Sequence, residues 1–317
     1  MKRALKIIGI ITLVFVVLLT LLVVKIVRTP MVPNDYTQTV ATGGDIEAKY
    51  LAMGNYEVKY KEEKTTEVLK KYEVYYPEEL EQSERKYPVV VFVNGTGVYG
   101  SKYKALFKHL SSWGFIVLGN EDPGTWSGES ADKTLEYIIN ENSNKDSIFH
   151  NRVDLDNIGI SGHSQGGVGV FNAITENNHS DPYKTAVALS PTHEEAAIKL
   201  NIPYDLTKIK IPTMLIAGTG NFETQMVIPL ESMKTMYEKI NAPKVMMRKT
   251  GHEHGDMLYA ADGYVTAWFM WQLQDDEEAS KAFIGDNAEI EGNELYQNQS
   301  LNIFEDYSYN LHEPANI

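Results

Sequence analysis

The chain has 317 residues with an ordinary share of apolar and charged residues, so it is long enough to bury a sizeable core. It has no cysteine, which excludes a disulfide framework, a thiolate nucleophile and cysteine-ligated zinc or iron–sulfur sites. The formal net charge is −14; the first 28 residues carry five cations and no acid, so the rest of the chain sums to −19. A body this acidic argues against nucleic acid as a partner.

An uninterrupted apolar run occupies residues 7–24, and Lys2, Arg3 and Lys6 precede it. As a helix this run would be about 27 Å long, close to the ~30 Å hydrocarbon core of a bilayer. The run is longer than the apolar part of a cleaved signal peptide, which is the alternative, and no small-x-small cleavage site follows it. We therefore predict a signal anchor over residues 1–28. The preceding cations indicate a single-pass protein of the cell membrane with its catalytic domain outside.

Residues 29–50 contain prolines and glycines among polar residues, which predicts a linker between the anchor and a catalytic domain over residues 51–274. The domain opens with two stretches, 56–60 and 68–76, that are typical of strands. We expect them to form an antiparallel hairpin with the charged residues 61–64 at its tip.

From residue 89 onward, short apolar runs alternate with stretches of helical spacing. Strands are predicted at 89–93, 115–118, 158–161, 186–189, 213–217 and 245–248, and helices at 103–113, 131–139, 168–174, 227–240 and 264–273. This alternation predicts an α/β fold with a mainly parallel central sheet and helices on both faces. The short spacing between residues 189 and 213 leaves no room for a large cap domain. An acidic extension, 275–317, follows; its apolar residues favour packing on the body over a solvated tail.

A glycine-flanked serine, Gly162-His163-Ser164-Gln165-Gly166, lies between a predicted strand and a predicted helix. That strand–turn–helix context is the setting in which a G-x-S-x-G motif forms a nucleophile elbow. The serine sits at positive φ on a strained turn, so the residues two before and two after it must lack side chains. The following helix offers free N–H groups to a developing oxyanion. Ser164 is therefore the predicted nucleophile, and we expect His163 to point away from it as a packing residue.

A resemblance to the elbow region of α/β-hydrolases is carried by the run Asp154-x-x-Asn157-Ile158-Gly159-Ile160-Ser161-Gly162-His163-Ser164-Gln165-Gly166-Gly167. Within that superfamily the chain is most similar to capless esterases, namely polyester hydrolases of the cutinase-like type and chlorophyllase- or dienelactone-hydrolase-like proteins. The similarity covers residues 56–273. It implies the α/β-hydrolase fold, hydrolysis of small or polymeric carboxylic esters in the manner of an esterase or lipase, and no cofactor or metal.

In this fold the oxyanion hole uses the N–H after the nucleophile and a second from the loop after the third strand. Gln165 supplies the first. By similarity to polyester hydrolases the second is assigned to Thr96, in the loop Asn94-Gly95-Thr96-Gly97. Tyr99 and Trp126 fall in loops at the carboxyl edge of the sheet and are predicted to line the substrate cleft.

The general base is expected after the last strand, where His252 and His254 compete. The resemblance favours His254. The acid is expected in the loop after the strand at 213–217, where related proteins usually have an aspartate and this chain has Glu223. Glu is an accepted triad acid, and Ser164, Glu223 and His254 follow the chain order of the fold. Another acid, Glu194 or Glu195, is the alternative.

Three rival interpretations remain at this point. The same triad could serve a peptidase or an acyltransferase, because fold and triad do not choose the substrate. The fold could be a catalytically inactive binding module on the cell surface. A metal site could use His252, His254 and Asp256, although their spacing is not a zinc motif.

Overall fold

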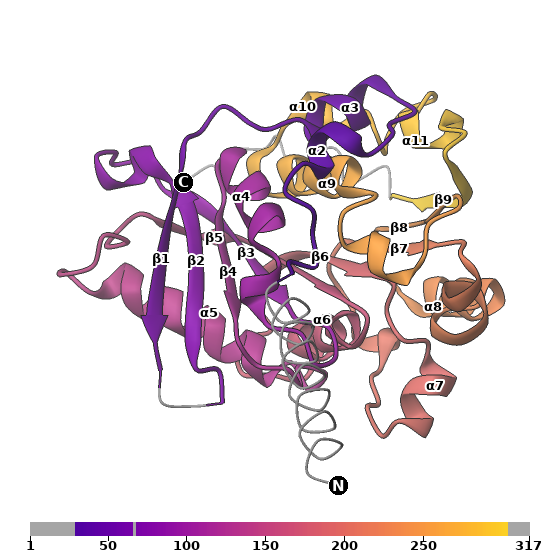
Figure 1. The fold of residues 1–317 in the computed structure, drawn as a ribbon, viewed down its shortest axis with the longest axis horizontal. Coiled ribbons are helices and arrows are strands. Elements are labelled where there is room, and N and C mark those ends of the chain that lie inside the picture. The colour runs from indigo at the N-terminus through magenta and orange to yellow at the C-terminus, as the bar shows by residue number, and fades with distance from the viewer. Residues whose placement is uncertain (1–28, 66–67, 304–317) are drawn as a thin grey trace, which may run out of the picture. The chain divides into compact units, whose positions relative to one another are not determined.

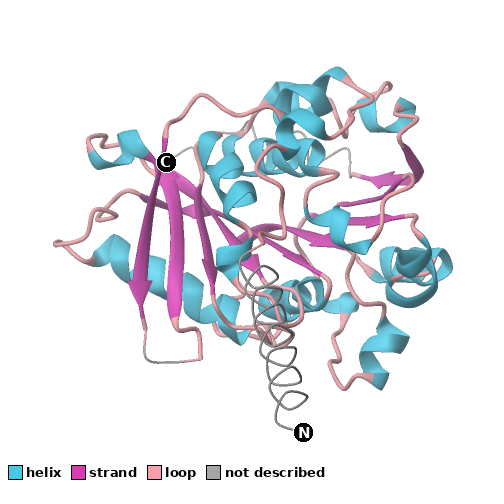
Figure 2. Cartoon of the chain, viewed as in Figure 1, coloured by secondary structure: helices cyan, strands magenta, loops and turns pink. Residues whose placement is uncertain are grey.

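A computed structural model describes residues 29–65 and 68–303, and within them nine strands form one sheet (Figures 1 and 2). The spatial order of the strands is β1-β2-β4-β3-β5-β6-β7-β8-β9. The strands are β1 (Val58–Lys64), β2 (Lys71–Pro77), β3 (Tyr87–Val93), β4 (Ile116–Asn120), β5 (Val153–His163), β6 (Tyr183–Leu189), β7 (Thr213–Gly218), β8 (Lys244–Lys249) and β9 (Tyr296–Asn302).

The centre of the sheet is parallel and its edges are antiparallel. Strands β4, β3, β5, β6, β7 and β8 pair in parallel, β1 and β2 run antiparallel at one edge, and β9 pairs antiparallel with β8 at the other. The mainly parallel sheet predicted from the alternating pattern is confirmed. The predicted hairpin forms, but the charged residues 61–64 lie within β1 and pair with residues 71–74, so they do not form its tip.

Helices cover both faces of the sheet. They are α2 (Tyr36–Thr39), α3 (Asp45–Leu51), α4 (Lys104–Ser112), α5 (Glu129–Ser143), α6 (Gln165–Thr175), α7 (Glu194–Lys199), α8 (Leu230–Lys239), α9 (Asp262–Gln274), α10 (Glu277–Ser280) and α11 (Glu289–Gly292). Tight helical turns are η1 (Glu78–Glu81), η2 (Gly100–Lys102), η3 (Leu206–Lys208), η4 (Glu223–Val227, a π-type turn) and η5 (His254–Leu258). Between β6 and β7 the chain forms only the short elements α7 and η3.

Successive residues of the central strands face opposite cores, which is why these strands read as continuous apolar runs. In β3, Val90 and Phe92 join the core under α3, α4 and α9. Val89, Val91 and Val93 of the same strand join the core under α5, α6 and α8. Both faces of the sheet are therefore dry, and the carboxyl ends of the parallel strands are left to carry polar loops.

The segment at residues 29–50 differs from the predicted linker, because it forms α2 and most of α3 and packs on the body. Tyr36 and Tyr50 are buried, and Tyr36 Oη donates a hydrogen bond of 2.5 Å to Asp262 of α9. Sequence reasoning missed these helices because each is short and its apolar residues gain a partner only from a distant part of the chain. Within the described residues no helix combines the length and apolarity needed to cross a membrane; the predicted span at 7–24 lies outside them.

A buried ion pair fastens this segment to the far edge of the sheet. Lys249 Nζ of β8 lies 2.7 Å from Glu47 Oε1 of α3, and both side chains are almost fully buried. Tyr296 Oη of β9 and Asn293 Nδ2 donate to the same carboxylate at 2.6 and 2.8 Å. Burial lowers the pKa of Lys249 even though Glu47 opposes the shift. The Glu47 carboxylate thus holds together α3, β8 and the segment that leads into β9, which are far apart in the sequence.

Replacing Glu47 by Gln should lower the free energy of unfolding by about 3–5 kcal/mol, because it leaves the Lys249 ammonium buried without a counter-charge. The double variant Glu47→Gln/Lys249→Met should recover most of that loss, since it removes the stranded charge as well. Urea unfolding followed by circular dichroism measures both values. Equal stability of the single and double variants would show that the ion pair is not what holds the segment.

Candidate active site

The turn between β5 and α6 has the strained geometry of a nucleophile elbow. Ser164 adopts φ 61° and ψ −122°, a backbone conformation that residues with side chains rarely adopt. A Cβ on Gly162 would lie 2.4 Å from Gly166 O, and a Cβ on Gly166 would lie 2.2 Å from Val93 O. Both glycines are therefore required by the close approach of β3, β5 and α6, as the sequence pattern indicated.

The start of α6 presents free amide donors beside the serine. Ser164 O accepts the N–H groups of Gly167 and Val168 at 2.9 and 3.4 Å. The N–H of Gln165, the first residue of the helix, has no acceptor among residues 29–65 and 68–303. It stands at the positive end of the helix dipole, where a developing negative charge is stabilised.

The loop after β3 leaves one further amide available. Gly95 N–H donates to Tyr103 Oη at 3.1 Å, and Gly97 N–H donates to Pro123 O at 3.0 Å. Thr96 N–H, between them, has no acceptor in the described part of the chain, and the residue is exposed. The hydrogen bonds of its neighbours fix the loop, so of the three successive amides at Gly95, Thr96 and Gly97 only that of Thr96 is without an acceptor among the described residues.

A histidine and a carboxylate meet at the carboxyl ends of β7 and β8. His254 Nδ1, at the start of η5, lies 2.7 Å from Glu223 Oε2 of η4. The carboxylate is fully buried, while the imidazole remains partly exposed. A carboxylate in such a contact fixes the tautomer and orientation of the imidazole.

The surroundings of Glu223 favour its ionised form. Burial would raise the pKa of the carboxyl, but the hydrogen bond and charge of His254, with further donors from Ser190 Oγ and Gly218 N–H, hold it below its usual value. The amide of Gly218 lies 3.1 Å from Oε1. Since each donor prefers the carboxylate to the acid, the group stays charged although it is buried.

His163 does not face away from the site as the sequence suggested. Its ring lies against the His254 ring, with centroids 4.4 Å apart, and its Nε2 donates to His254 O at 2.8 Å. Burial and the neighbouring His254 lower the pKa of His163 to about 3, so this ring stays neutral. Because His163 directly precedes Ser164, it links the turn of the nucleophile to the backbone of His254.

The alternative acids and the alternative base are engaged elsewhere. Glu194 and Glu195 pair with Lys239 and Lys199 at 2.7 and 2.8 Å. His252 is partly exposed, and its Nδ1 lies 3.8 Å from Asp256. Among the residues that the structure describes, no three metal-ligating side chains gather, so the trio His252, His254 and Asp256 does not form a metal site there.

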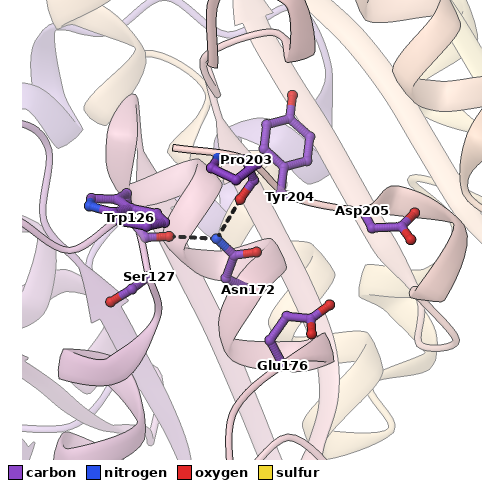
Figure 3. Close-up of a pocket in the computed structure, with 7 residues that line it drawn as sticks. All are labelled: Trp126, Ser127, Asn172, Glu176, Pro203, Tyr204 and Asp205. Atoms are coloured by element: carbon purple, nitrogen blue, oxygen red, sulfur yellow. Dashed lines mark hydrogen bonds between the residues drawn. The ribbon is translucent and has the colours of Figure 1, made fainter. Parts of the chain in front are cut away.

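The two residues predicted to bind substrate have different surroundings. Tyr99 is half-buried under the ammonium of Lys70, which is 4.5 Å from its ring. Trp126 borders a shallow pocket of about 390 Å³ (Figure 3). Its lining comprises Trp126, Ser127, Asn172, Glu176, Pro203, Tyr204 and Asp205. Asn172, in the pocket wall, lies two turns along α6 from Ser164, about 12 Å in helical rise. The pocket is therefore beside α6 and not at the elbow.

Sequence reasoning missed an apolar rim, formed by Phe222 and Met226, on the turn that carries Glu223. Phe222 and Met226 are 55% and 62% exposed, which is unusual for large apolar side chains, and the Phe222 ring is 5.9 Å from that of His254. Loop residues on either side of Glu223 give no periodic signal that could have marked them. They place exposed apolar surface at the turn that carries Glu223.

Comparison with curated proteins finds no match to this chain. The model of the family described as PETase, PET hydrolase-like, matches residues 37–299 and so spans strands β1 to β8, part of β9, the elbow and both loops of the histidine–glutamate pair. The earlier identification with capless polyester hydrolases is confirmed, and the chain belongs to the PET hydrolase-like family, a polyester hydrolase family of the α/β-hydrolase superfamily.

Proposed function

We propose that the chain is a carboxylic-ester hydrolase that works through a Ser164–His254–Glu223 triad and an acyl-enzyme. His254 takes the proton of Ser164 Oγ as that oxygen attacks the acyl carbon, and it then protonates the leaving alcohol. Water, deprotonated by the same imidazole, cleaves the acyl-enzyme and releases the acid. The amides of Thr96 and Gln165 bind the oxyanion in both steps.

The single observation that carries this proposal is the 2.7 Å contact between His254 Nδ1 and the buried Glu223, next to the elbow. An imidazole held in this way has its Nδ1–H committed to the carboxylate, which leaves Nε2 as the basic nitrogen. His163, the residue directly before Ser164, packs its ring against that imidazole. A binding module would gain nothing from a buried carboxylate kept ionised under a histidine.

Family membership supports ester bonds as the target. The apolar rim supports a substrate with apolar groups next to the ester bond. Phe222 beside His254, with Met226 on the same turn, provides uncharged surface against which the acyl or alcohol portion of an ester can pack. The connection between β6 and β7 is too short to form a large lid, which suits extended or polymeric esters. An acidic body also disfavours free carboxylate products, so they should leave readily.

The test is turnover of a p-nitrophenyl ester series of graded acyl length, together with a fluorophosphonate probe and peptide mapping. We expect hydrolysis and stoichiometric labelling on the peptide that carries Ser164, because only an activated serine reacts with such a probe. Folded protein that neither hydrolyses nor labels would contradict the proposal and favour a binding module. If the protein is labelled but cleaves only amides, or only transfers the acyl group to an added alcohol, Ser164 is still the nucleophile. The chain would then be a peptidase or an acyltransferase and not an ester hydrolase.

A further inference from the structure

A second serine contacts the proposed triad from the opposite side of the acid. Ser190 directly follows β6, is fully buried, and donates a hydrogen bond from Oγ to Glu223 Oε1. Its backbone adopts φ 45°, in the left-handed region that residues with side chains avoid. A buried residue keeps such a conformation only where the surrounding structure holds it, so Ser190 is a candidate for a functional role.

The segment 189–190 connects the two ends of the triad. Leu189 O accepts the N–H of Ser164 at 2.9 Å, and Ser190 N–H donates to Ile216 O at 2.6 Å. The backbone of these two residues therefore ties the elbow to β7, from which the loop carrying Glu223 departs. The strained φ of Ser190 is fixed by that bond, and the same residue donates its hydroxyl to the acid.

We propose that Ser190 is a positioning residue that holds the Glu223 carboxylate in register with His254, an inference that rests on the proposed function. Glutamate has one more rotatable bond than aspartate, and here it leaves from a π-type turn, so a single contact with His254 would leave its carboxylate free to rotate. The hydroxyl of Ser190 and the amide of Gly218 hold Oε1 while Oε2 faces the imidazole. Ser190 acts only through the acid and does not touch substrate.

The charged and titratable groups around Glu223 set the expected pH effect. His254 of η5 faces it directly, His163 of β5 is close enough to interact, and Arg248 of β8 is buried with its Nε bonded to Gly218 O at 2.8 Å. The Ser190 hydrogen bond is one of the contacts that lower the pKa of Glu223. Without it that pKa rises, so the loss of activity caused by protonating Glu223, at the acidic end of the profile, begins at a higher pH.

The experiment compares Ser190→Ala with Ser190→Gly in the full chain. Both remove the hydroxyl, but glycine also relieves the positive φ, so the two should differ in stability and agree in activity. We expect both to lower kcat about 10- to 100-fold, the range for a lost hydrogen bond to a charged group, with KM unchanged and the acid limb at higher pH. Ser161→Ala is the matched control: Ser161 is also buried, on the adjacent β5, and its Oγ has no partner among the described residues.

Wild-type kcat and pH profile in both Ser190 variants would overturn the inference. So would a loss of activity in Ser190→Ala that Ser190→Gly restores, because backbone strain would then be the cause. The proposed function is checked separately by probe labelling of the wild type at Ser164 and by a loss of activity in Glu223→Gln. If labelling and that loss both occur while the Ser190 variants remain normal, the triad stands and only the role of Ser190 falls.

Discussion

Ser164→Ala should lower the kcat of ester hydrolysis by about 10⁶-fold and abolish labelling by a fluorophosphonate. The substitution removes the oxygen that would form the acyl-enzyme, while the amides of Thr96 and Gln165 remain in place. The residual activity should therefore be what an oxyanion hole and binding alone provide, and KM should stay within a few-fold of the wild type. Steady-state kinetics on a short-chain p-nitrophenyl ester, at a protein concentration determined by absorbance, measures both constants.

The fold should survive this change, since alanine keeps the glycines of the elbow and adds no atom near them. A thermal midpoint within a few degrees of the wild type is the control. The backbone at Ser164 stays at positive φ in the variant, so the strain is neither relieved nor increased. Substantial ester hydrolysis by folded Ser164→Ala protein would mean that another group is the nucleophile, and the role assigned to the elbow would be wrong.

The parallel core and the elbow could be predicted from the sequence because both depend on local pattern. A strand buried on two faces is apolar at every position, as at Val89 to Val93, whatever its neighbours are. The glycines around Ser164 satisfy a steric demand that arises within five residues. Once the fold is identified, its usual chain order of serine, acid and histidine indicates in which loops to look for the acid and the base.

The features that escaped prediction depend on contacts between distant segments. Helix α3 is stabilised by Glu47 reaching Lys249, and β9 pairs with β8 more than 40 residues earlier. The role of Ser190 cannot be read from Ser-Pro-Thr, because its hydroxyl meets Glu223 only after β6 and β7 pair. His163 was misread for the same reason, since its neighbour His254 is 91 residues away.

His254→Ala should lower kcat by about 10⁴- to 10⁶-fold, whereas His252→Ala should lower it less than about tenfold. The two histidines share one loop, one residue type and a similar distance from β8, so each is the matched control for the other. Only His254 places a ring nitrogen on the buried Glu223, and only its ring lies against His163 beside the nucleophile. His252 instead points toward Asp256 at 3.8 Å with its ring partly in solvent. Steady-state kinetics of the two variants at one pH, with circular dichroism to verify folding, decides the matter. If His252→Ala proved the inactive variant, His252 would be the base and the pairing of His254 with Glu223 would be structural alone.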